Sequence, residues 1–84
     1  MYNLKENYII KNIEEGILLI DIKDTKNIYQ FNSIGAYIIQ NISKPKQDII
    51  KELTTKYKIE EQQVSKDYQD FINILLGNDI IKVK

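Results

Sequence analysis

The segment NIYQFNSIGAYIIQNI, residues 27–42, changes from a strand pattern to a helix pattern with only Asn32 and Ser33 between the two. In its first half, Tyr29 and Phe31 share one face of the expected strand, and their neighbours share the other. Ser33 is expected to cap the helix, because its hydroxyl can accept hydrogen bonds from first-turn backbone N–H groups that otherwise lack partners. The segment therefore predicts a strand that runs directly into a helix.

Further elements are expected on both sides of this junction. Two apolar, β-branched runs precede it and are separated by Glu14-Glu15, which favours a hairpin or short loop. The predicted strands comprise residues 8–13, 16–22 and 27–31, the predicted helices about residues 33–42, 46–57 and 60–76, and a last strand residues 80–83. Ser43 or Lys44 is expected to cap the second helix, with Pro45 in its first turn. Gly77-Asn78 is expected to end the third helix.

This order of elements indicates an α+β fold. It is typical of a winged helix-turn-helix, here a three-stranded antiparallel sheet followed by three helices and a short C-terminal strand. Because the chain has 84 residues, residues 1–84 are expected to form a single domain with a small core and marginal stability. A partner that binds the folded state would add to that stability.

The residue types that are missing argue against catalysis. The chain has no cysteine, histidine, tryptophan or arginine, so it lacks thiolate ligands, disulfides and the usual general base. We therefore expect no catalytic residue, metal or cofactor; Asp21 and Asp24 lack the further ligands and the glycine of a calcium loop. Three acid pairs are more simply turns, first-turn dipole partners or solvated faces: Glu14-Glu15, Glu60-Glu61, and Asp67 with Asp70. One alternative to a non-catalytic protein is an enzyme subunit that contributes acidic residues to an active site shared with another chain.

Charge and hydropathy bear on location and on nucleic acid. A signal pattern and an apolar run of membrane-span length are both lacking, which predicts a cytoplasmic protein without a membrane partner. Twelve lysines balance twelve acids, so no net charge attracts nucleic acid. A small winged-helix transcriptional regulator is the alternative function. Its recognition helix would carry Lys66 as its one cation beside four acids, which disfavours DNA phosphate contacts.

The third predicted helix has a wide apolar face that could cover the core. Its members are Val64, Tyr68, Phe71, Ile72, Leu75 and Leu76. Ile74 lies beyond the edge of this stripe, and it is either an ordinary packed or exposed residue or one wall of a groove. The third strand could form the other wall, because it ends the meander and carries no lysine or proline to protect a sheet edge.

Several short motifs occur in an order that is typical of a known family. Asp24 in an acidic turn precedes the strand YQFN (residues 29–32), and the following helix contains GAYII (residues 35–39). Tyr57, the pattern V-x-x-D-x-x-x-F-I-x-x-L (residues 64–75) and a closing IIKV come next. Over residues 8–83 the chain resembles the PqqD-like proteins, or RiPP recognition elements, where RiPP denotes a ribosomally synthesised and post-translationally modified peptide. The family often has Ile-Trp where this chain has Ile38-Ile39, which keeps an apolar core position.

The resemblance implies a non-catalytic protein that binds the leader segment of a precursor peptide and presents the core segment to a processing enzyme. The leader would add as a strand beside the third strand and lie against the third helix. Carried over by position, the peptide-binding residues would be Ile28, Tyr29, Gln30, Phe31, Asp67, Asp70, Phe71 and Ile74. Tyr29 and Phe31 could instead be core residues that offer only their backbone. The enzyme would be a lasso-peptide leader protease or, next, a radical-SAM maturase, and the recognition protein a monomer or an edge-paired dimer.

Overall fold

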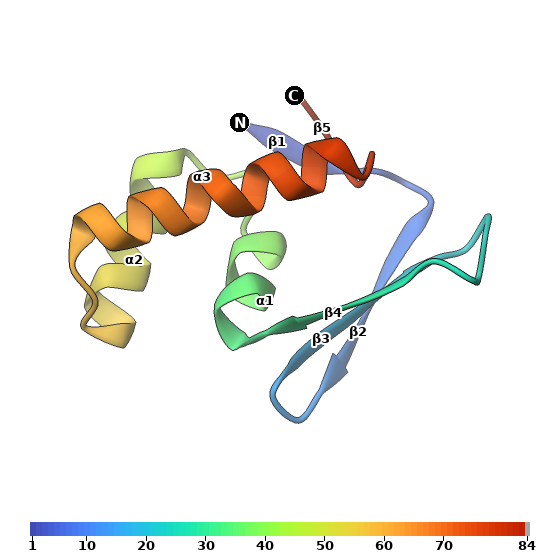
Figure 1. Ribbon diagram of the computed structural model, residues 1–84, viewed down its shortest axis with the longest axis horizontal. Helices are drawn as coiled ribbons and strands as arrows, with labels where there is room; N and C mark the ends of the chain where they lie inside the picture. The colour runs from blue at the N-terminus through green and yellow to red at the C-terminus, as the bar shows by residue number, and fades with distance from the viewer. Residues whose placement is uncertain (84) are drawn as a thin grey trace.

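Three helices lie on one side of a three-stranded antiparallel sheet, and two short strands near the chain ends form a second sheet (Figure 1). The first helix packs directly on the sheet, and the second helix packs on the third. This computed structural model describes residues 1–83. The strands are β1 (Tyr2–Leu4), β2 (Tyr8–Ile13), β3 (Gly16–Asp21), β4 (Ile28–Asn32) and β5 (Ile81–Val83), and the helices are α1 (Ser33–Gln40), α2 (Lys46–Tyr57) and α3 (Glu61–Gly77). The α+β class and the order of elements predicted from the sequence are confirmed.

The main sheet has the strand order β2-β3-β4, with both pairs antiparallel. Its middle strand alternates between two faces, as a pleated strand must. Ile17 and Leu19 are buried on the helix-covered face. On the other face, Ile9, Ile20 and Ile28 form a cross-strand row, and the two outer members of this row are exposed. The helices therefore cover one side of the sheet only.

Sequence reasoning missed the first strand. β1 pairs antiparallel with β5, so that Tyr2 faces Val83 and Leu4 faces Ile81. This pairing brings the two ends of the chain side by side (Figure 1). Three residues are too few to establish an alternating pattern, and the pairing depends on a segment almost eighty residues away in the sequence. The predicted last strand is present as β5.

Two helix caps differ from those expected. Asn32, not Ser33, caps α1, and its side chain accepts a hydrogen bond from the Gly35 amide. Pro45 itself occupies the N-cap position of α2, so neither of the two preceding residues caps that helix. The helix α1 also ends at Gln40, two residues earlier than predicted. The remaining helix limits agree with the prediction to within one residue.

The core lies between β3 and the three helices. The stripe predicted for α3 is largely confirmed, because Val64, Tyr68, Ile72 and Leu75 are buried. Leu76 is 40% exposed, so its predicted place in the core is wrong. Periodicity puts Leu76 near the edge of the stripe but cannot locate where the core ends along the helix. Within residues 1–83, no helix combines the length and hydropathy needed to cross a membrane.

Candidate functional site

β4 is an edge strand, because it pairs with β3 on one side only. The Asp21 amide donates to the Asn27 carbonyl (3.1 Å) immediately before β4. In an antiparallel pair such hydrogen-bonded positions recur at every second residue. Tyr29 and Phe31 therefore direct their backbone N–H and C=O groups toward β3.

The alternate residues of β4 face the free edge. By the same periodicity, Ile28 and Gln30 direct their N–H and C=O groups away from β3. Proteins usually protect such an edge with lysine, proline or a covering element. The opposite edge strand, β2, contains Lys11, whereas β4 (IYQFN) contains neither lysine nor proline. β4 is therefore an edge strand that carries neither of these protective residues.

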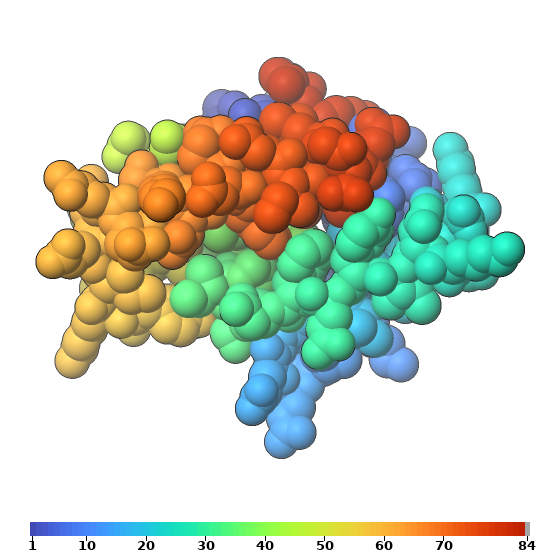
Figure 2. All heavy atoms as spheres, viewed as in Figure 1, coloured from blue at the N-terminus to red at the C-terminus, as the bar shows by residue number. Residues whose placement is uncertain are grey.

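A groove of about 360 Å³ lies beside this edge. We call it the β4–α3 groove; it is lined by Gln30, Phe31, Asn32, Ile34, Gly35, Ile38, Asp67 and Phe71. On the face of the molecule drawn in Figure 2, α3 (orange to red) lies above β4 and α1 (green). The walls are thus the strand edge and α3, and the first turns of α1 supply much of the floor.

Two aromatic rings and a glycine shape the groove. The rings of Phe31 and Phe71 meet edge to face, with centroids 5.1 Å apart and an interplanar angle of 84°. A Cβ atom on Gly35 would lie 3.1 Å from Phe31 Cβ and 3.2 Å from Phe71 Cζ. A residue without a side chain is therefore what allows both rings to approach α1. At the rim, the Asp67 carboxylate accepts a hydrogen bond from the Gln63 side chain at 2.9 Å.

Tyr29 and Phe31 both pack against the core. They continue a series of ring contacts from Tyr8, with centroid distances of 6.4 Å for Tyr8–Tyr29 and 6.3 Å for Tyr29–Phe31. Both residues are half-buried against the core cluster, and burial raises the pKa of Tyr8 at the inner end of the series. Phe31 additionally lines the groove. Its side chain is thus both a core residue and part of the groove wall.

The eight residues predicted for peptide binding fall into two groups. Gln30, Phe31, Asp67 and Phe71 line the groove. The other four do not line it: Tyr29 is half-buried against the core, and Ile28, Asp70 and Ile74 are exposed. The Ile28 side chain points to the outer sheet face and is 55% exposed, so only its backbone belongs to the free edge. Ile74 is 54% exposed on α3, three residues beyond Phe71.

Sequence reasoning did not assign four lining residues to the groove: Asn32, Ile34, Gly35 and Ile38. The spacing of the two isoleucines indicated only that they face inward. Gly35 was the one residue that could have indicated the groove, because a glycine within a helix lowers the stability of the helix and often marks a place where another group packs closely.

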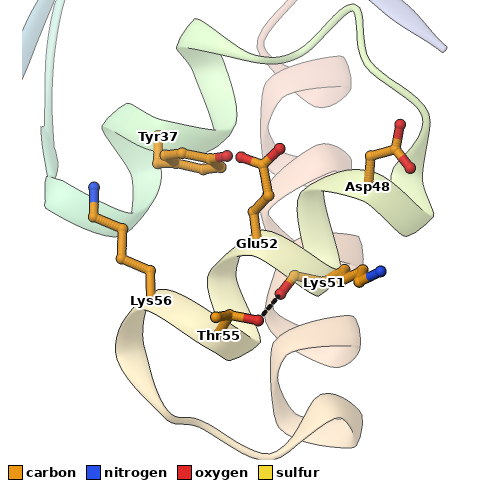
Figure 3. Close-up of a pocket in the computed structure, with 6 residues that line it drawn as sticks. All are labelled: Tyr37, Asp48, Lys51, Glu52, Thr55 and Lys56. Atoms are coloured by element: carbon orange, nitrogen blue, oxygen red, sulfur yellow. Dashed lines mark hydrogen bonds between the residues drawn. The ribbon is translucent and has the colours of Figure 1, made fainter.

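A larger hollow, about 510 Å³, lies between α1 and α2 (Figure 3). Tyr37 of α1 contributes to it, and the rest of its lining comes from α2: Asp48, Lys51, Glu52, Thr55 and Lys56. The Lys56 ammonium lies 5.5 Å from the centre of the Tyr37 ring, and Glu52 pairs with Lys44 at 3.4 Å. Helices satisfy their own backbone groups, so this hollow offers no strand edge. We therefore assign the candidate site to the β4–α3 groove.

The acids that could have held a metal have structural partners instead. The Asp21 carboxylate accepts hydrogen bonds from Asn7 Nδ2 at 3.0 Å and from the amides of Lys23 and Asp24 at 2.9 and 3.3 Å. The Asn7 bond, with the amides, lowers the pKa of Asp21, although burial acts in the opposite direction. Asp21 thus fixes the turn between β3 and β4. Among residues 1–83 no group of three acids is placed to hold a metal ion.

The fold and groove define a small winged helix-turn-helix protein with an open sheet edge beside its third helix. The family model of coenzyme PQQ synthesis protein D (PqqD) matches residues 15–81. The chain belongs to the PqqD family, as the sequence motifs indicated. A comparison with curated protein sequences gives no match.

Two solved structures share the fold over almost their whole length. One is TbiB1 in complex with the TbiA(beta) leader peptide, with 14% sequence identity, a TM-score of 0.85, and coverage of 98% of this chain and 96% of that chain. The other is a lasso peptide synthetase B1 complexed with the leader peptide, with 20% identity, a TM-score of 0.86, and coverage of 98% of both chains. At this identity the likeness establishes the fold.

Proposed function

We propose that this protein binds the leader segment of a ribosomally synthesised precursor peptide and presents the core segment to a processing enzyme. The observation that carries the proposal is the bare edge of β4 next to an apolar groove. Membership of the PqqD family supports it. So do two proteins of the same fold that were solved with leader peptides.

Binding would occur by strand addition. The leader backbone would pair with the outward N–H and C=O groups of Ile28 and Gln30, and every second leader side chain would face α3. Phe31 and Phe71 would then contact an apolar leader side chain in the groove. Backbone pairing would supply much of the affinity, and the groove would supply the selectivity.

The protein would contribute no reactive group to the processing reaction. It would act by raising the effective concentration of the core segment at the active site of the enzyme. We favour a lasso-peptide leader protease as that enzyme, because one protein of the same fold is a lasso peptide synthetase B1. A radical-SAM maturase is the next candidate, since the family is named for coenzyme PQQ synthesis.

The direct test is calorimetric titration with the leader of the precursor encoded near the gene for this protein. Gln30→Pro removes an outward N–H without removing a bond to β3, so it should weaken leader binding about tenfold or more while the fold is kept. The matched control is Asn12→Pro on the opposite edge. The backbone N–H of Asn12 points away from β3, as that of Gln30 does. This follows because the Ile22 amide donates to the Asn7 carbonyl, and hydrogen-bonded positions on β2 then recur at every second residue.

Normal leader affinity in a folded Gln30→Pro protein would argue against strand addition at β4. A leader that bound no better than millimolar, together with salt-dependent binding of duplex DNA, would overturn the proposed function in favour of a transcriptional regulator.

A further inference from the structure

We propose that the β4–α3 groove selects peptides with a lysine or arginine beside the apolar side chain that enters it, and that Asp67 sets this preference. The inference rests on the proposed function and specifies the class of peptide that the same site would take. It follows from the charges around the groove.

Asp67 is the one charged residue among those that line the groove. Its carboxylate has a neutral partner, the Gln63 amide, at 2.9 Å. Within residues 1–83 the ion pairs are Lys5–Asp79, Lys44–Glu52 and Lys82–Glu6, none of which involves α3. Asp67 therefore presents a negative charge at the rim that no cation of the described chain neutralises.

The neighbouring elements do not balance this charge. β4 (IYQFN) and α1 (SIGAYIIQ) contain no charged residue at all. On α3 the exposed Asp70 lies one turn beyond Asp67 and adds a second negative charge near the groove. A peptide lying between β4 and α3 would thus meet an anionic rim beside the two aromatic rings of the groove.

Two lysines belong to the segments that form or directly precede the groove walls. Lys66 is the only lysine on α3, and it lies roughly 140° around the helix axis from Phe71, farther from the groove than Asp67 or Asp70. Lys26 precedes β4 in the turn from β3, at the end of β4 opposite Asn32. Because Asn32 and Asp67 line the groove together, the anionic end of the groove is the end at which β4 joins α1.

The expected effect is selectivity more than strength. Charges at a solvent-exposed rim change affinity only a few fold, but they discourage a like charge and speed the approach of an opposite one. A lysine or arginine on the guest strand can also lay its methylene groups along apolar surface while its charged end reaches Asp67. The two Phe rings and Asp67 would therefore contact neighbouring side chains of the same bound peptide.

The test is a display selection of fully randomised twelve-residue peptides on the intact protein and on single variants. The wild type should enrich lysine or arginine at one position near an apolar residue. Asp67→Asn should reduce this enrichment, and Asp67→Lys should replace it with aspartate or glutamate. Glu61→Gln is the matched control, because it removes the same charge from the same helix on the side that faces α2; it should select the same peptides as the wild type.

A second measurement uses one lysine-containing peptide from the wild-type selection. Its affinity should fall about two- to fivefold when its lysine is replaced by glutamine, and the difference should shrink in about 1 M salt, where the screening length is about 3 Å. Peptides without cation enrichment, or an unchanged preference in Asp67→Lys, would overturn the inference. If the selected peptides showed no cation preference but still bound the Gln30→Pro variant more weakly than the wild type, the proposed function would stand and only the inference about Asp67 would fail. Failure to select any peptide that depends on the β4 edge would overturn both.

Discussion

The ring of Phe71 on α3 meets the ring of Phe31 on β4 edge to face, at 5.1 Å between centroids and 84° between planes. This contact joins the third helix to the sheet edge and forms the aromatic part of the groove. An edge-to-face pair adds about 0.5–1.5 kcal/mol beyond its burial. The contact therefore helps to fix the position of α3 relative to the free edge of β4.

Gly35→Ala tests the closeness of this packing. An added Cβ would lie 3.1 to 3.3 Å from Phe31 Cβ and from two atoms of the Phe71 ring, so the ring must shift by a few tenths of an ångström. Alanine also favours a helix by about 1 kcal/mol over glycine, which offsets part of the steric strain. We expect the free energy of unfolding to change by less than about 1 kcal/mol, while leader affinity falls several fold. Chemical denaturation and calorimetry would check the two effects separately, and unchanged affinity would argue that the ring position does not shape the site.

Gly16→Ala should, in contrast, have a large effect on the stability of the fold. Gly16 opens β3 with φ at 153°, and a Cβ there would lie 1.9 Å from the carbonyl oxygen of Phe31 in β4. Because backbone cannot move aside as a side chain can, we expect a loss of about 2 kcal/mol or more in the free energy of unfolding. Urea denaturation measures this loss. A variant as stable as the wild type would mean that β3 and β4 are held less closely than they are here.

The sequence predicted best those features that a local pattern determines. Apolar periodicity and Pro45 predicted α2 at residues 46–57, where it lies. Alternation predicted that Tyr29 and Phe31 share one face of their strand, and the structure shows that this face packs against the core. The prediction that Ser33 caps α1 was wrong, because the cap depends on a contact with a strand that is distant in the sequence. Asn32 pairs with Gly16 across the sheet and stays extended, at φ −73° and ψ −176°, so the helix can begin only at Ser33.

The groove was predictable in part. Gln30, Phe31, Asp67 and Phe71 were assigned to the site by the family resemblance, which carries peptide-binding positions over to the third strand and the third helix. Ile34 and Ile38 had only a helical spacing to mark them, and spacing indicates an inward direction without naming the neighbour. Which element lies opposite depends on how α1 packs under α3, and that packing comes from contacts between segments distant in the sequence.

The turn between β3 and β4 should make stability sensitive to acid. The Asn7 side chain and the amides of Lys23 and Asp24 lower the pKa of Asp21 in the folded state. A carboxyl group whose pKa is lower when folded stabilises the fold above its unfolded pKa of about 3.9, and this contribution is lost as the pH falls through the folded value. Asp21→Asn should therefore be less stable than the wild type at pH 7, and it should lose less stability between about pH 5 and pH 2.

Denaturation curves across this pH range measure the difference in slope. Asn7→Ala provides a second variant, because it removes the donor with the largest effect and should move the acid-sensitive range to higher pH. Equal slopes for the wild type and Asp21→Asn would show that Asp21 does not link the turn to folding.

Ile74 and Leu76 form a natural pair for testing which side of α3 receives the leader. Both are exposed, at 54% and 40%, but they lie roughly 160° apart around the helix, and Ile74 is on the side of Phe71. Ile74→Asp should weaken leader binding by about 1 to 3 kcal/mol with little loss of stability, because the complex would bury a charge where an apolar contact is expected. Leu76→Asp makes the same chemical change on the other side and should leave the calorimetric affinity unaltered. Equal effects of the two substitutions would mean that the leader does not lie along the groove side of α3.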